Sequence, residues 1–192
     1  IFSHHYEDRF HKGDMTGYLG IGYEYRDYAY ECSLIQQWSP SGIPGHDYLG
    51  DGNVGITYDV SYSIPYVEFA LADRQDKLNV EISFGYSPYV RAEDKDAHLI
   101  RIPGPIYAEG DCTGNSLKCA AAIQYDFTPH WSMKLIFDHL YIRAKGEQDN
   151  IIYAGTDGTS SWGQSSWTTD ERIISRVSYF TMNVAYRFGL KH

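Results

Sequence analysis

A strict alternation of apolar and polar residues constrains the fold of this chain more than any other feature. Between residues 54 and 63, valine, isoleucine and tyrosine occupy the even positions, while glycine, threonine, aspartate and serine occupy the odd ones. Similar runs cover 78–87, 117–127, 133–141 and 180–188. Successive side chains of an extended backbone point to opposite faces, so each run predicts a strand with one apolar face. With the Gly- and Tyr-rich stretch 17–33, the pattern predicts about six long strands and an all-β fold.

The phase of the alternation changes once inside a strand, at Pro65. Beyond this proline the apolar residues are Val67, Phe69 and Leu71, so they occupy odd rather than even positions. An extra residue in one strand moves the following side chains to the other face, and proline is found in sheets mainly at edges and bulges. We therefore expect a bulge or kink at Pro65.

The strand connections and the aromatic residues favour a membrane barrel over a soluble sandwich. The predicted connections are short at 72–77 and 128–131 and long at 38–52, 92–112 and 145–170. The chain has 18 Tyr, 8 Phe and 4 Trp, many of them near strand ends, yet its mean hydropathy is -0.43. Long strands, unequal loops and aromatic girdles are typical of transmembrane barrels. We expect one antiparallel transmembrane β-barrel domain over residues 1–192.

Charge and cysteine content exclude several other classes of protein. The net charge is -9 and the basic residues are scattered, which argues against a nucleic-acid partner. The three cysteines lack metal-site spacing, and we expect neither a metal nor a bound cofactor. Cys112 and Cys119 could pair across a short loop, which would leave Cys32 free.

The segment "EDKDAHL" places Asp94, Asp96 and His98 at alternating positions. If the segment is extended, these three side chains share one face. An imidazole can take a proton from water, and a nearby carboxylate fixes its tautomer and stabilises the imidazolium. The triplet is therefore either a solvated strand rim or half of a catalytic site.

Four stretches of the chain resemble the omptins, outer-membrane proteases of Gram-negative bacteria. They are "GIGYEYRDYAY", "ITYDVSYSIPYVEFAL", "FGYSPYVRAEDKDAH" and "YDFTPHWSMKL", and the resemblance covers residues 17–188. It implies a ten-stranded barrel in the outer membrane, with its active site facing the exterior, that cleaves peptides or proteins near basic residues. By the same resemblance His98 is the general base, Asp96 orients it, and Asp94 helps to bind a basic side chain of the substrate.

The chain departs from the omptin pattern upstream of this triplet. In the family, the attacking water lies between the Asp-His pair and a facing pair of aspartates, but no Asp-x-Asp precedes residue 94. The segment 6–18 is also too short for the full strand expected there. The sequence begins at Ile1 without an initiator methionine. We therefore expect an N-terminally truncated barrel whose incomplete site could leave this form inactive.

The resemblance also implies lipopolysaccharide as a lipid activator, held by basic residues on the outer face of the barrel. This chain has Ser61 at one expected arginine position, and Arg26 is offset by one from the other. The dependence on lipopolysaccharide is therefore open. Two other functions also stay open: a non-enzymatic outer-membrane barrel that acts as an adhesin or surface-binding protein, and a soluble all-β binding domain.

Overall fold

A computed structural model describes residues 2–12, 15–33, 36–37, 48–49, 52–99, 104–155 and 162–188. Seven strands form one sheet in the order β1-β2-β5-β6-β7-β8-β9, and every neighbouring pair is antiparallel. Their bounds are β1 (Phe2–Lys12), β2 (Met15–Ser33), β5 (Val54–Gln75), β6 (Leu78–His98), β7 (Ile106–Asp126), β8 (Trp131–Gly155) and β9 (Trp162–Tyr186). The short strands β3 (Gln36–Gln37) and β4 (Tyr48–Leu49) pair with each other. The prediction of an all-β antiparallel fold with about six long strands is confirmed.

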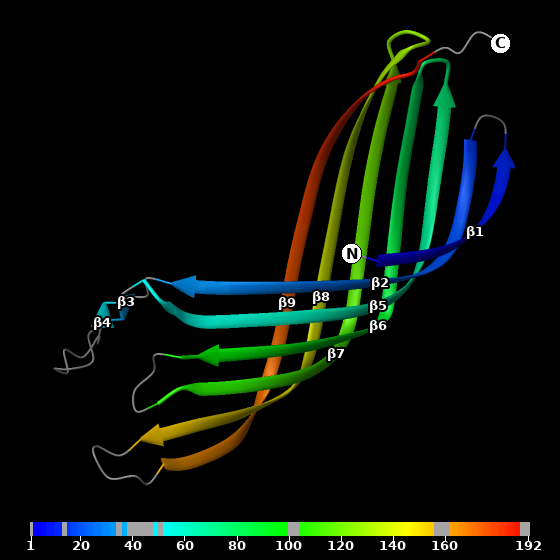
Figure 1. Ribbon diagram of the computed structural model, residues 1–192. Helices are drawn as coiled ribbons and strands as arrows, with labels where there is room; N and C mark the ends of the chain where they lie inside the picture. The colour runs from blue at the N-terminus through cyan, green and yellow to red at the C-terminus, as the bar shows by residue number, and fades with distance from the viewer. Residues whose placement is uncertain are drawn as a thin grey trace.

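The sheet is curled, as Figure 1 shows. Each long strand runs upright at one end of the molecule and bends in its middle toward the other end. Within the described residues β1 and β9 form the two edges of the sheet. No helix in those residues is long and apolar enough to cross a membrane.

The sheet exposes apolar side chains on its outer face and buries polar ones on its inner face, which is the reverse of a soluble protein. On the outer face of the upright arm, large apolar side chains such as Phe84 and Phe180 are 61% and 71% exposed. On the inner face, polar side chains are buried, among them Glu24, Arg26 and Ser83. A transmembrane barrel has this arrangement, because its apolar face contacts lipid and its polar face lines the interior.

The apolar core lies on the inner face, where the strands bend. It contains residues from five strands, among them Val60, Tyr62, Ile64, Val90, Ala92, Cys112, Leu140, Ile142, Ala144 and Ile173. Glycine is required where the backbones of β7 and β8 approach closely. A Cβ at Gly146 would lie 2.0 Å from the carbonyl oxygen of Asp111.

The bulge expected at Pro65 is not in β5: a register shift lies beside the proline, but the extra residue belongs to the neighbouring strand β6. The register between β5 and β6 shifts between Ser63 and Val67. Ile64, Tyr66 and Ala70 are buried and Val67 and Phe69 are exposed on the outer face, so the even positions of β5 face inward on both sides of the proline. The pairing of β6 with β7 shifts at the same place, between Ser87 and Val90, so both shifts come from one extra residue in β6.

Two of the predicted long loops are shorter in the structure than the sequence suggested. Strand β6 continues to His98 and β7 begins at Ile106, so most of 92–112 is strand; β8 and β9 likewise extend to Gly155 and from Trp162. In these segments both faces carry polar residues, so the alternation that marks a strand is lost although the backbone pairing continues. Cross-strand ion pairs such as Lys95–Glu109 at 3.1 Å lie in this part of the sheet.

The segment 6–18, expected to be too short for a full strand, contributes to the start of β2 and to β1, which has 11 residues against 19 in β2 and 25 in β8. The expected pairing of two cysteines needs correction. Cys112 and Cys119 lie in the same strand, β7, and all three cysteines are free. Seven residues apart on an extended strand, their side chains point to opposite faces, so they cannot form a disulfide.

Candidate functional site

The end of β6 places the three predicted site residues on one face, as the alternation required. Asp94 is buried, and Asp96 and His98 are half-buried. Glu93 and Lys95, on either side of Asp94, are exposed on the opposite face. Charged residues on the outer face indicate that this part of the sheet lies beyond the apolar band. The extended geometry predicted for "EDKDAHL" is therefore confirmed.

Asp96 and His98 are in direct contact. His98 Nε2 lies 3.1 Å from Asp96 Oδ2, and the two side chains are 33% and 24% exposed. The other carboxylate oxygen of Asp96, Oδ1, is buried and has no hydrogen-bond partner within the described part of the chain. Because Nε2 faces the carboxylate, the second ring nitrogen, Nδ1, is left to face a substrate or a water.

Asp94 lies beside a second carboxylate that the sequence did not reveal, Glu171 of β9. A Cβ at Gly110 would lie 2.2 Å from Asp94 Oδ1 and 2.1 Å from Glu171 Oε2, so both oxygens converge over this glycine. Asp94 is 2% exposed, and its carboxyl group interacts with the side chains of Glu171 and Gln148. Burial, followed by the negative charge of Glu171, raises the pKa of Asp94 to about 7.

Neighbouring side chains hold Glu171 in this position. The thiol of Cys112 donates to Glu171 Oε2 at 3.4 Å, and the amide of Gln148 lies 3.5 Å from Oε1. Burial raises the pKa of Cys112 to about 12, and its hydrogen bond to Glu171 adds to the effect, so this thiol stays protonated. Burial also raises the pKa of Tyr58, and the negative charge of Asp94 contributes.

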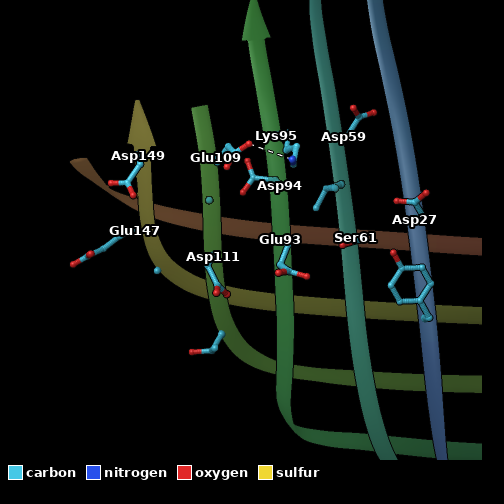
Figure 2. A pocket seen from close by; sticks show the side chains of 15 residues that line it. Asp27, Asp59, Ser61, Glu93, Asp94, Lys95, Glu109, Asp111, Glu147 and Asp149 are labelled. Atoms are coloured by element: carbon cyan, nitrogen blue, oxygen red, sulfur yellow. Dashed lines mark ion pairs between the residues drawn. The ribbon is translucent and has the colours of Figure 1, made fainter. Parts of the chain in front are cut away.

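A hollow of about 1050 Å³ lies across β2, β5, β6, β7 and β8 at this end of the sheet (Figure 2). Eight carboxylates and one lysine are among its lining residues: Asp27, Asp59, Glu93, Asp94, Glu109, Asp111, Glu147 and Asp149, with Lys95. Except for Asp94, these side chains belong to the face opposite to His98, because they occupy the other parity of each strand. The hollow is therefore not where His98 acts, but its charge makes this end of the sheet strongly negative.

Two residues noted in the sequence lie elsewhere. Arg26 is buried on the inner face, where it pairs with Glu24 at 2.5 Å and donates to the Tyr28 hydroxyl at 3.1 Å. It is therefore not available on the outer face to hold a lipid. Ser61 lies on the outer face and lines the acidic hollow. In the described residues no group of histidine, cysteine and acidic side chains could hold a metal ion.

Comparison with known proteins shows a family and a structural similarity. The model of the Omptin family matches residues 22–188. The structure is similar to the crystal structure of the outer membrane protease OmpT from Escherichia coli, with a TM-score of 0.62 and 19% sequence identity. The similarity covers 97% of this chain and 62% of the OmpT chain, so the chain spans less than two thirds of that protein. A search of curated proteins gives no match.

Proposed function

The chain belongs to the Omptin family, and on this basis we propose that it is an outer-membrane endopeptidase that uses Asp96 and His98 to activate water. The observation that carries the proposal is the contact between His98 Nε2 and Asp96 Oδ2 at 3.1 Å. An imidazole paired with a carboxylate is a general base matched to neutral pH. The family and the apolar outer face of the sheet both support the outer membrane as its location.

In the proposed reaction, His98 removes a proton from a water molecule as the water oxygen attacks the carbonyl carbon of the peptide bond. Asp96 fixes the ring orientation and stabilises the imidazolium that forms. The imidazolium then returns the proton to the leaving amine as the C–N bond breaks. Water is consumed and no covalent bond to the protein forms.

The charge of this end of the sheet supports substrates with basic residues. The hollow shown in Figure 2 carries eight carboxylates and one lysine, and that lysine is paired with Glu109. A strongly negative surface raises the local concentration of cationic peptides and speeds their association. We further propose that Asp94 binds the basic side chain and that this end of the sheet faces the cell exterior.

A matched pair of variants tests the role of the dyad. Full-length protein, refolded in detergent with and without lipopolysaccharide, is given a fluorogenic peptide with paired basic residues. Asp96→Asn is expected to lower the rate by about 10²–10⁴-fold, because general-base catalysis contributes that much. Asp170→Asn removes an exposed carboxylate of β9 and should leave the rate unchanged. Equal rates for Asp96→Asn and the wild type would refute the role of the dyad.

One observation favours a second function. No Asp-x-Asp precedes residue 94, so the chain lacks the sequence signal for a carboxylate pair facing the dyad. A barrel without that pair would present its acidic end as a binding surface rather than an active site. If the folded protein cleaves no peptide but binds cationic peptides, the surface-binding function replaces the protease.

A further inference from the structure

We propose that Tyr30 and Tyr58 form an aromatic subsite beside the dyad, and that this subsite binds an aromatic side chain of the substrate. The inference rests on the proposed function and adds a specificity that the carboxylates do not provide. It begins with one row of the sheet, in which Tyr30 of β2 pairs with Tyr58 of β5, and Tyr58 pairs with Asp96 of β6. Directly paired residues share a face, so both rings lie on the inner face with Asp96 and His98.

The inner face at this end of the sheet has two chemically different parts. The part on β6 and β9 carries the carboxylates of Asp94, Asp96 and Glu171. On β2 and β5 the inner-face residues at the same level are all uncharged: Tyr28, Tyr30, Cys32, Val54, Ile56, Tyr58 and Val60. A basic side chain finds no carboxylate on this second part, whereas an apolar side chain finds rings and methyl groups to contact. The second part therefore suits an apolar ligand.

Contacts among the rings hold this aromatic subsite in place. Tyr28 and Tyr30 stack with ring centroids 6.3 Å apart, and Tyr30 and Tyr58 stack at 6.2 Å. The row is anchored at Tyr28, whose hydroxyl accepts a hydrogen bond from Arg26 at 3.1 Å and whose ring meets the edge of Tyr62 at 6.2 Å. Rings that are already fixed by their neighbours lose little conformational entropy when they bind a ligand.

Tyr30 leaves much of its ring available to a ligand. It is 55% exposed although it contacts two other rings. The outer face at this level carries Asp27 and Asp59, so this part of the sheet lies beyond the apolar band and the exposure of Tyr30 is not a contact with lipid. An aromatic side chain of a peptide can stack on the free part of this ring, as aromatic pairs do in protein interiors.

The spacing of the strands sets the position of the bound residue in the peptide. Strand β2 is separated from β6 by β5 alone. Neighbouring strands are about 4.8 Å apart, so β2 lies about 10 Å from β6. An extended peptide advances about 3.3 Å per residue, so a peptide that crosses these strands from the dyad reaches Tyr30 about three residues from the cleaved bond.

The test uses fluorogenic peptides with paired basic residues that carry phenylalanine or alanine three residues before or after the cleaved bond. At one of these two positions the refolded wild type should prefer phenylalanine by about tenfold in kcat/KM, because partial burial of the ring and its stacking on Tyr30 both contribute. Tyr30→Ala should remove the preference, and Tyr30→Phe should keep it, since the ring and not the hydroxyl makes the contact.

Tyr107→Ala is the matched control. Tyr107 is 43% exposed and its ring contacts Tyr153, but both lie on the outer face of the same end of the sheet. This variant should keep the preference for phenylalanine. Tyr30→Glu places a carboxylate at the exposed position of β2 and should also remove the preference, so it replaces Tyr30→Ala if that variant does not fold.

Fluorescence anisotropy of the labelled peptides measures affinity without turnover. Bound to the wild type and to His98→Ala, the phenylalanine and alanine peptides should differ in Kd by about tenfold, because the ring binds away from the reacting atoms. No preference at either position, or a preference that persists in both Tyr30→Ala and Tyr30→Glu, would overturn the proposal. If the wild type cleaves nothing but binds the phenylalanine peptide more tightly through Tyr30, the aromatic subsite stands and the protease fails. If the wild type cleaves both peptides equally well, the protease stands and the aromatic subsite fails.

Discussion

Replacing Asp94 by asparagine should stabilise the protein in alkaline solution and have little effect in acid. The folded-state pKa of Asp94 is raised from 3.8 to about 7, first by burial and then by the charge of Glu171. Between about pH 4 and pH 7 the folded protein therefore binds more protons at this site than the unfolded chain does. The stability contributed by this bound proton is fully present at the acidic end of this window and is lost as the pH rises through it.

The size of the effect follows from the shift. Each pKa unit corresponds to about 1.4 kcal/mol, so a pKa raised from 3.8 to about 7 sets an upper value of about 4 kcal/mol. We therefore expect Asp94→Asn to gain about 2 to 4 kcal/mol at pH 8. At pH 4 Asp94 is neutral in the folded protein and nearly half neutral in the unfolded chain. The gain there should be close to zero.

Urea unfolding of the refolded protein in detergent, followed by tryptophan fluorescence at pH 4 and pH 8, measures this difference. Asp111→Asn is the control, because the hydrogen bond from Arg91 at 2.8 Å lowers the pKa of Asp111. A carboxylate with a lowered pKa stabilises the folded state above its unfolded pKa, so Asp111→Asn should not stabilise the protein at pH 8. An Asp94→Asn variant no more stable than the wild type at pH 8, or a gain of equal size at both pH values, would refute the reasoning.

Two further predictions concern close packing and thiol chemistry. Gly110→Ala should separate Asp94 from Glu171 and raise KM for basic peptides at least tenfold, measured by peptide cleavage. The control, Gly85→Ala, should leave KM unchanged, because its new Cβ would lie 3.3 Å from the Cβ of Lys118. An unchanged KM in Gly110→Ala would contradict the convergence of the two acids. In the folded protein, Cys32 should react with a maleimide and Cys112 should not, because the first is exposed and the second is buried with a pKa raised to about 12. Mass spectrometry of the labelled protein checks this, and rapid labelling of Cys112 would contradict its burial.

The sequence predicts the membrane half of the sheet well because one face there is apolar and the other polar. Runs such as 78–87 and 133–141 carry that alternation, and they lie within strands β6 and β8. The prediction fails for 92–112 and 145–170, where polar residues occupy both faces. Backbone pairing alone extends the strands there, and it leaves no pattern in the side chains.

The candidate site also has one part that the sequence predicts and one part that it does not. Contact between Asp96 and His98 follows from a spacing of two on one strand, so local sequence is sufficient to predict it. The position of Glu171 depends on the register of three successive strand pairs and on glycine at 110 and 146. A lone glutamate in "TTDERI" carries no sign of that partnership, since the carboxylates approach only when the sheet curls.

Turnover by His98→Ala tests the central claim most directly. The variant and the wild type are refolded under the same conditions with lipopolysaccharide, beside His130→Ala, which alters an exposed histidine in the turn between β7 and β8. We expect cleavage of the paired-basic peptide to fall by about 10²–10⁴-fold in His98→Ala and to persist in His130→Ala. Wild-type turnover by folded His98→Ala would show that the Asp96–His98 pair does not activate the water.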